Sequence, residues 1–316
     1  MPAEFPAVIV ICGPTATGKS AQALLLAEQL GSLLISADSR QIYRELDIGT
    51  AKPTPEQQAR WPHHLIDIAD PTERWTVAQY QALAQGLIQQ AHQQGRIPIL
   101  VGGTGLYLQA ATGGLGIPTV SPHLLLRQQL ESWPLSVQHS FLQQVDPVAA
   151  VKIHPHDQVR ILRALEVYYV TGQPTSAQQQ RRDPSFRVLT LGLTCEMDRL
   201  ERRIAQRTDQ MLEAGWIPEV ERLRQRYGAH LPLLQTLGYE EIGLYLDGQL
   251  SQKELAPLIA RRTRQFAKRQ MTWFRKTPDL HWLNCEDRDL TQQIEARVKD
   301  FLALSPRDPS PASSPR

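Results

Sequence analysis

The segment Gly13–Ser20 has the residue types and spacing of a phosphate-binding loop, G-x-x-x-x-G-K-[S/T]. Its two glycines let the backbone curl until several N–H groups point inward at anionic oxygens. Lys19 adds a full positive charge, and Ser20 adds a hydroxyl that can bind a magnesium ion. We therefore expect a di- or triphosphate to bind Gly13, Pro14, Thr15, Ala16, Thr17, Gly18, Lys19 and Ser20.

A phosphate loop alone does not identify the reaction. Hydrolytic enzymes of this loop class usually carry an acidic residue at the end of a later buried strand, where it holds magnesium. Here the apolar run Ile97–Val101 leads into Gly102-Gly103-Thr104-Gly105, which contains no carboxylate. The sequence thus argues against an ATPase, whereas a small-molecule kinase remains open.

Asp38 is a candidate general base. It directly follows the apolar run Leu33–Ala37, and ligands of open α/β sheets bind outside the carboxyl ends of the strands. Asp38, Thr104 and the phosphate loop should therefore face one crevice. A carboxylate there can take a proton from a nucleophile that attacks a group attached to the bound phosphate. The alternative, that Asp38 only caps a turn or binds magnesium through water, is equally supported by the residues alone.

The elements that must position these residues alternate between strands and helices. Buried strands are predicted for five apolar runs, the last of them weaker: Val8–Cys12, Leu33–Ala37, Ile97–Val101, Val188–Leu193 and His281–Leu283. Helical patterns lie between them at Lys19–Leu30 and Val77–Gln94. This alternation predicts an α/β fold, with a parallel sheet like that of P-loop NTPases and helices on both of its faces.

The alternation stops between Pro118 and Asp183, where only helical patterns occur. The clearest one, Asp157–Val170, has Asp157 as a cap and Gly172 as a stop. We interpret residues 118–183 as an all-helical domain inserted into the core, whose two parts are residues 1–117 and 184–304. The Pro- and Ser-rich residues 305–316 are predicted to form a disordered tail.

The charge of the chain is nearly balanced, because its 316 residues carry a formal net charge of only +2. Binding to a nucleic acid would therefore depend on local clusters of positive charge. One such cluster is the helical pattern Ala256–Lys276, which holds seven Lys and Arg residues and no Asp or Glu. We expect one face of this helix to contact phosphates, while Trp273 and Phe274 pack in the core.

Composition excludes several other classes of protein. The N-terminus lacks the basic region of a signal peptide, and no run approaches the roughly 18 apolar residues of a membrane helix. The three cysteines, Cys12, Cys195 and Cys285, have neither metal-ligand nor disulfide spacing. We expect a monomeric, cytoplasmic protein that does not bind membranes.

Several strings of residues together resemble one family, the bacterial tRNA dimethylallyltransferases, also called tRNA isopentenyltransferases or IPP transferases. The strings follow the family's order from about Val8 to Leu283. Besides the phosphate loop they are ISADSRQIYR at 35–44, DIGTAKP at 47–53, PHHLID at 62–67, VGGTGLY at 101–107, RALEV at 163–167 and AKRQMTWFR at 267–275. One departure is Glu240, at a position where the family commonly has a basic residue.

The resemblance implies a donor, an acceptor and a cofactor. They are dimethylallyl diphosphate, the N6 amine of the adenosine just 3′ of the tRNA anticodon (position 37), and Mg²⁺ bound in part by Ser20. Asp38 would be the general base on that amine, Thr104 would help to hold the acceptor, and the phosphate loop would hold the leaving diphosphate. The implied tRNA contacts are Asp38, Ser39, Arg40, Gln41, Thr104, Val159, Arg160, Ile161, Leu162, Arg163 and a basic residue early in the insertion, for which Arg127 is the candidate.

The chemistry of such a transfer suits these residues. An exocyclic adenine amine is a poor nucleophile because its lone pair is conjugated into the ring. A carboxylate that accepts its proton contributes about 10²–10⁴ in rate, which favours the role of base for Asp38. The target base lies in a stacked anticodon arm and has to be taken out of its stack, so we expect the helical insertion to contact the RNA.

Two other interpretations fit part of the sequence. One is a nucleoside or small-molecule kinase, with ATP in the phosphate loop and Asp38 as base toward a hydroxyl. A kinase of a small substrate, however, needs neither the insertion nor the basic helix. The other is an RNA-binding protein with a nucleotide-dependent switch, which the missing carboxylate after Ile97–Val101 disfavours.

Overall fold

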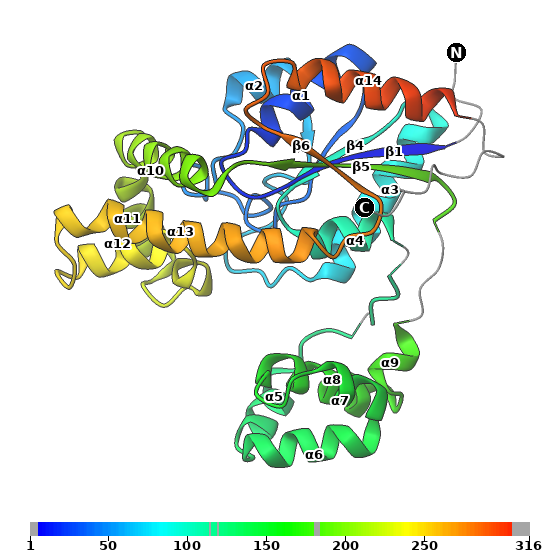
Figure 1. Cartoon of the computed structure of the whole chain (residues 1–316). Coiled ribbons are helices and arrows are strands. Elements are labelled where there is room, and N and C mark those ends of the chain that lie inside the picture. Colours follow the sequence, from blue (N-terminus) through cyan, green and yellow to red (C-terminus); the bar gives the residue numbers. More distant parts are fainter. Residues whose placement is uncertain (1–5, 114, 119, 180–183, 305–316) are drawn as a thin grey trace. The chain divides into compact units, whose positions relative to one another are not determined.

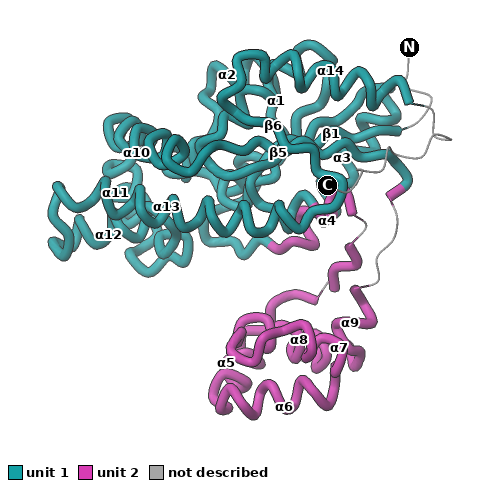
Figure 2. Tube along the Cα trace, in the orientation of Figure 1, with its two compact units in different colours: residues 1–75, 82–108, 185–316 teal, residues 76–81, 109–184 magenta. Residues whose placement is uncertain are grey.

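The chain forms two compact units, shown in Figure 2. The computed structural model describes residues 6–113, 115–118, 120–179 and 184–304. Unit 2 consists of residues 76–81 and 109–184, and unit 1 of the remaining described residues. Unit 2 thus includes the helical stretch that we interpreted as an insertion and begins earlier, because residues 109–117 belong to it. The expected tail, residues 305–316, lies outside the described residues.

Unit 1 is built on a six-stranded sheet in which every pair of neighbouring strands is parallel. The strand order is β3-β2-β4-β1-β5-β6. The strands are β1 (Ala7–Cys12), β2 (Leu34–Ser36), β3 (His63–His64), β4 (Ile99–Gly102), β5 (Arg187–Thr194) and β6 (Leu280–Asn284). The predicted parallel α/β core and its five strands are confirmed. Strand β3 was missed because two residues are too short to show a periodicity.

The centre of the sheet is β1, all six residues of which are buried. Neighbours on both sides explain why this run is apolar throughout, since Ile9 pairs with Ile99 of β4 and with Leu189 of β5. The register also aligns the strand ends, with Cys12 opposite Gly102 on the adjoining strand. The segments that follow β1, β2 and β4 therefore leave the sheet at the same edge.

Helices cover both faces of this sheet. On one face, α1 (Lys19–Leu30) and α14 (Leu290–Ala303) pack onto the strands through Leu26 and Ile294 (Figure 1). The long helix α13 (Gln252–Phe274), drawn in orange in Figure 1, runs along the opposite side of the sheet from α1 and α14. A short helix α2 (Pro55–Arg60) precedes β3, and two helices, α3 (Val77–Gln93) and α4 (Gly105–Thr112), are each divided between the units.

A group of helices follows β5 in unit 1. It consists of α10 (Met197–Glu213), α11 (Trp216–Tyr227), the 3-10 helix η1 (Pro232–Gln235), α12 (Tyr239–Leu246) and α13. Helix α13 packs against both α10 and α12. It begins with a capping box, in which the N–H of Ser251 donates to Glu254 at 3.0 Å. The helix predicted around residues 256–276 is thus confirmed.

Among the described residues of unit 2, helices are the only regular secondary structure. Its helices are α5 (Leu124–Glu131), α6 (Leu135–Val145), α7 (Pro147–Lys152), α8 (Gln158–Thr171) and α9 (Thr175–Gln178). They enclose a core of their own that includes Leu130, Leu142 and Leu165. The predicted cap is present, since Asp157 accepts a hydrogen bond from the N–H of Arg160 at 3.2 Å.

Across the described residues of both units, no helix is at once long and apolar enough to cross a membrane.

Candidate active site

The phosphate loop connects β1 to α1, as its sequence predicts. Gly13 adopts a φ of +138°, and a Cβ atom there would lie 2.4 Å from the backbone oxygen of Leu193, so only glycine fits. Gly18 is left-handed, with a φ of +81°, and α1 begins at the next residue. The N-terminus of α1 therefore lies at the end of the loop, where the partial positive charge of the helix dipole favours an anion.

Two arginines of α10 hold this loop in place. The guanidinium of Arg203 donates to the backbone oxygen of Ala16 at 2.8 Å, and that of Arg207 donates to the hydroxyl of Thr15 at 3.4 Å. The local sequence does not reveal either contact, because both arginines lie more than 180 positions from the loop. Their spacing of four residues, which puts them on one side of a helix, was the only local signal.

Lys19 carries the loop's own side-chain charge. Its ammonium group donates to the backbone oxygen of Pro14 at 3.1 Å. Burial, and next the nearby Arg207, lower the pKa of Lys19 to about 8, while Asp38 acts in the opposite direction. A bound anion would favour the charged amine, so above about pH 8, where the free lysine has lost its proton, binding of a diphosphate would restore that proton.

Asp38 and Thr104 lie on adjacent segments that leave β2 and β4. The carboxylate of Asp38 accepts a hydrogen bond from the N–H of Arg40 at 2.8 Å. The hydroxyl of Thr104 accepts one from the N–H of Ser39 at 3.1 Å and is 3.4 Å from the hydroxyl of that serine. The predicted meeting of these two residues at the strand ends is thus observed.

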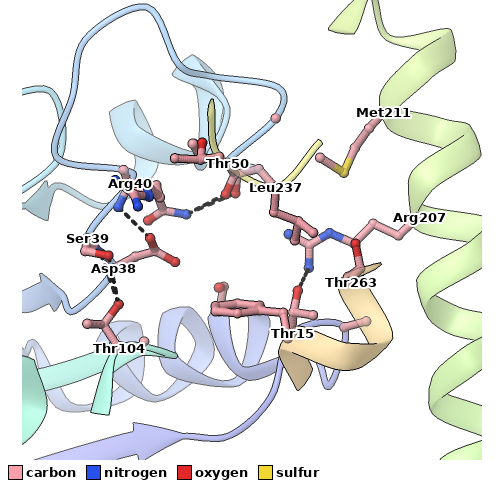
Figure 3. A pocket seen from close by; sticks show the side chains of 18 of the residues that line it. Thr15, Asp38, Ser39, Arg40, Thr50, Thr104, Arg207, Met211, Leu237 and Thr263 are labelled. Atoms are coloured by element: carbon pink, nitrogen blue, oxygen red, sulfur yellow. Dashed lines mark hydrogen bonds between the residues drawn. The ribbon is translucent and has the colours of Figure 1, made fainter. Parts of the chain in front are cut away.

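These groups line one cavity of about 420 Å³ in unit 1. Figure 3 shows Asp38 and Thr104 on one side of it, and Thr15 with the side chain of Arg207 on the other. Helices α10, α11 and α13 complete the wall and add apolar side chains, among them Met211, Trp216 and Phe266. The cavity therefore combines cationic, anionic and apolar surfaces, as a site for a small molecule requires.

The segment 47–53 forms a further part of this wall and is held by a buried carboxylate. Glu219 of α11 is 1% exposed and accepts the backbone N–H groups of Asp47, Ile48 and Gly49 at 2.7–3.1 Å. It also accepts the hydroxyl of Tyr239 at 2.8 Å. Charge-assisted bonds to three successive N–H groups fix the backbone of this segment firmly.

The basic face of α13 is less cationic than its sequence indicates. Arg262 pairs with Glu240 at 2.6 Å and with Glu241 at 2.8 Å, and Arg264 pairs with Glu201 at 2.6 Å. The acidic partners come from α12 and α10, so the local sequence could not reveal them. Glu240, the departure from the family's pattern, is thus one of the residues that neutralise this helix.

The prediction that both aromatic residues of α13 pack in the core is half right. Phe274 is 2% exposed, which confirms its place in the core, but Trp273 is 39% exposed. The ring of Trp273 lies over the turn after β4, where a Cβ atom on Gly105 would be 2.1 Å from it. Trp273 is therefore partly exposed and packs over Gly105, the residue next to the cavity-lining Thr104.

In unit 2, two of the expected RNA-contacting arginines are engaged with a carboxylate. Glu166, whose side chain is fully buried, accepts hydrogen bonds from Arg127 at 2.9 and 2.8 Å and from Arg163 at 2.6 Å. Burial alone would raise the pKa of Glu166, but bonds from Arg127, the N–H of His123 and Arg163 hold it below its usual range. Arg127 and Arg163 therefore have a structural task.

The other expected contacts of unit 2 divide into exposed and buried residues. Val159 is 79% exposed, and the side chain of Arg160 is 66% exposed while paired with Asp157 at 3.3 Å. Ile161 and Leu162 are 0% and 5% exposed, because they face the core of the unit. The side chains of Ile161 and Leu162 thus pack inside the unit, whereas those of Val159 and Arg160 are exposed. RNA contact by the stretch 159–163 stays a prediction.

Taken together, fold and site define a class of protein: phosphate-loop α/β enzymes whose cavity at the strand ends holds a carboxylate opposite the loop. The sequence profile of the family described as "IPP transferase" matches residues 41–277, and that described as "Isopentenyl transferase" matches residues 6–66. The chain belongs to the IPP transferase family, as the resemblance indicated.

Relatives match over nearly the whole chain. The tRNA dimethylallyltransferase of Synechococcus sp. (strain JA-3-3Ab) is 62% identical over 298 residues, covering 94% of this chain and 88% of that protein. The solved tRNA isopentenylpyrophosphate transferase of Bacillus halodurans is 39% identical, with a TM-score of 0.70 and coverage of 94% and 97%. A eukaryotic dimethylallyltransferase solved while acting on tRNA has a TM-score of 0.82 at 31% identity, with coverage of 94% and 79%.

Proposed function

We propose that this chain transfers the dimethylallyl group of dimethylallyl diphosphate to N6 of the adenine at position 37 of tRNA. The products are N6-dimethylallyladenosine in the tRNA and free diphosphate. The single observation that carries the proposal is the cavity of unit 1, where an anion-binding loop faces Asp38 and Thr104. The family to which the chain belongs, and the names of its relatives, support the same activity.

The transfer needs one bond to break while another forms. The bond between C1 of the dimethylallyl group and the diphosphate oxygen breaks, and its electron pair leaves with the diphosphate. Backbone N–H groups of the loop, Lys19 and Arg207 would stabilise the developing negative charge. The adenine N6 attacks C1, and Asp38 takes the proton that the nitrogen must lose. Thr104 would hold the acceptor beside Asp38.

A magnesium ion fits the phosphate loop only together with the donor. Among the described residues, no cluster of three or more His, Cys, Asp or Glu side chains could hold a metal ion. The exposed Ser20 at the start of α1 offers one hydroxyl, and Mg²⁺ commonly completes its shell with substrate phosphates and water. When bound, Mg²⁺ would neutralise charge on the diphosphate. This arrangement makes Mg²⁺ dependence part of the proposal.

The tRNA would be bound by residues of both units. We assign phosphate contacts to three cationic residues of α13 for which no ion pair is found within the described structure, Arg261, Lys268 and Arg269. In unit 2, the exposed Val159 and Arg160 are the proposed contacts. Flipping the target base out of its stack would require a few kcal/mol, which such contacts offset. A tRNA substrate also implies that the protein works in the cytoplasm, and we propose that it does so as a monomer.

A label-transfer assay tests the proposed function. Dimethylallyl diphosphate labelled in the isoprenoid should pass its label to unmodified tRNA when Mg²⁺ is present, and a tRNA with guanine at position 37 should accept none. Transfer of label from γ-labelled ATP to a small hydroxyl compound, with none from the isoprenoid, would establish a kinase instead.

A further inference from the structure

Gln270 of α13 joins two segments of the cavity wall that are far apart in sequence. Its side-chain oxygen accepts the backbone N–H of Thr15 in the phosphate loop at 3.0 Å. Its side-chain nitrogen donates to the backbone oxygen of Gly103 in the turn after β4, also at 3.0 Å. Gln270 is 7% exposed; its bond to Gly103 is buried and its bond to Thr15 is partly buried. One amide thus bridges the loop and the turn.

The turn after β4 is shaped to receive this amide. A Cβ atom on Gly103 would lie 2.2 Å from the side-chain nitrogen of Gln270, so any larger residue would displace it. Two residues further along, the absence of a side chain at Gly105 lets the ring of Trp273 of α13 approach the backbone closely. Helix α13 therefore contacts the backbone of residues 103–105 directly, and the glycines there are explained by its side chains.

The turn that Gln270 holds also carries Thr104, and Thr104 is bonded to Ser39 next to Asp38. The amide therefore connects the segment that would bind the leaving diphosphate with the segment that would bind the acceptor. We propose that Gln270 is a positioning residue, which fixes the distance between the phosphate loop and the Thr104 turn and so places the donor carbon against the attacking nitrogen. This inference rests on the proposed function.

The proposal has a kinetic signature. Gln270 is uncharged and its oxygen is already engaged with Thr15, so it adds little to the binding of a diphosphate. Lys19, Arg207 and the remaining N–H groups of the loop supply that binding. Without the bridge the two segments would drift apart, and a displacement of about 1 Å between reacting groups lowers the rate by about 100-fold. The effect should therefore appear in kcat and leave KM nearly unchanged.

Gln270→Met tests the bridge, because methionine has a similar length and volume but makes neither hydrogen bond. We expect kcat for label transfer to fall by about 10- to 100-fold, with the KM of dimethylallyl diphosphate changing by less than about threefold. The matched control is Gln225→Met on the exposed face of α11, which should behave like the wild-type protein. Gln270→Asn, whose amide is too short to reach both partners, serves as a second variant if the methionine variant does not fold.

Hydrogen exchange gives a measure that does not depend on turnover. In Gln270→Met, the amides of residues 13–18 and 102–106 should exchange faster than in the wild-type protein and in Gln225→Met, while those of β1 stay unchanged. A fall in kcat together with this local acceleration supports the proposal. A kcat within about threefold of wild type, or a defect confined to KM, overturns it. Absence of label transfer by the wild-type protein would instead refute the proposed function, and the exchange data would still report whether the bridge exists.

Discussion

The cavity of unit 1 and the Glu166 cluster of unit 2 contain the same kinds of side chain in opposite arrangements. Each has one carboxylate with several cations near it: two arginines around Glu166, and Lys19, Arg40, Arg207 and Arg269 along the cavity wall with Asp38. In unit 2, Glu166 bonds directly to Arg127 and Arg163. In unit 1, Asp38 accepts a hydrogen bond from a backbone N–H, and two of the cations that line the cavity, Lys19 and Arg207, donate to oxygens of the phosphate loop. Within the described residues, neither cation forms an ion pair with Asp38.

The difference separates a structural cluster from a reactive site. Charges that neutralise each other in a buried cluster provide no free charge for a ligand. Removing one partner of such a cluster leaves an uncompensated buried charge, which destabilises the fold. Charges held apart across a cavity keep their capacity to act on a substrate. Burial lowers the pKa of Arg207, although Asp38 opposes this, so the guanidinium would gain from an arriving anion. The phosphate-loop side of the cavity is therefore where a diphosphate is expected.

The largest expected effect is on Asp38. Asp38→Asn keeps the shape and the bond to Arg40 but removes the proton acceptor, so turnover should fall at least about 100-fold. Binding of tRNA, measured by filter retention, and the urea midpoint of unfolding should stay near those of the wild-type protein. Turnover equal to wild type would remove Asp38 from the role of base.

Glu166→Gln is the counterpart of that change in unit 2. Because it leaves Arg127 and Arg163 without their carboxylate, we expect it to lower the free energy of unfolding by about 3 kcal/mol. Urea denaturation monitored by circular dichroism measures this decrease. Turnover per folded molecule should remain far higher than in Asp38→Asn. A stable protein with a large defect in turnover would contradict the contrast between the two carboxylates.

Arg207→Gln should act on the donor. Without the guanidinium the cavity loses a partly buried cation, so the KM of dimethylallyl diphosphate should rise by about 10-fold or more, the scale of one charged hydrogen bond. Arg222→Gln, on the exposed face of α11, provides a control with the same change of charge. Steady-state kinetics with saturating tRNA measures the effect, and an unchanged KM would show that Arg207 does not meet the diphosphate.

The pH dependence of donor binding should follow Lys19. Since burial and Arg207 lower its pKa to about 8, Lys19 is charged below that pH and the donor binds at full strength. Above pH 8 the free protein has lost this proton, and binding must restore it, so KM rises as the pH increases. Lys19→Arg should remove the inflection, because a guanidinium stays charged. A KM that is flat from about pH 7 to 9.5 would refute this assignment.

The smallest expected effect concerns the surface of α13. Replacing Arg261 and Lys268 by glutamine should weaken tRNA binding and lower the salt slope of log K by about one unit for each cation that is neutralised. Arg264→Gln should have a smaller effect, since Arg264 is already paired with Glu201. Equal effects of all three would mean that the pairing does not persist when RNA binds.

The sequence predicted those parts of the site that lie within short continuous motifs next to a predicted strand. The phosphate loop, Asp38 and Thr104 follow apolar runs, and parallel strands bring the ends of such runs to one edge. It could not predict Arg203, Arg207 or Gln270, because each reaches the loop from a helix far along the chain. For the same reason the sequence could not predict the ion pairs of Arg127, Arg262 and Arg264, because the carboxylates that neutralise them come from other helices.

The central claim is that Asp38 deprotonates the nitrogen while the phosphate loop holds the leaving diphosphate. A crystal structure with an anticodon stem-loop and an unreactive thiodiphosphate analogue of the donor tests it most directly. We predict the diphosphate in the loop between Thr15 and Ser20, and a carboxylate oxygen of Asp38 within about 3 Å of the adenine N6. Asp38 turned away from that nitrogen, with another group in its place, would contradict the account.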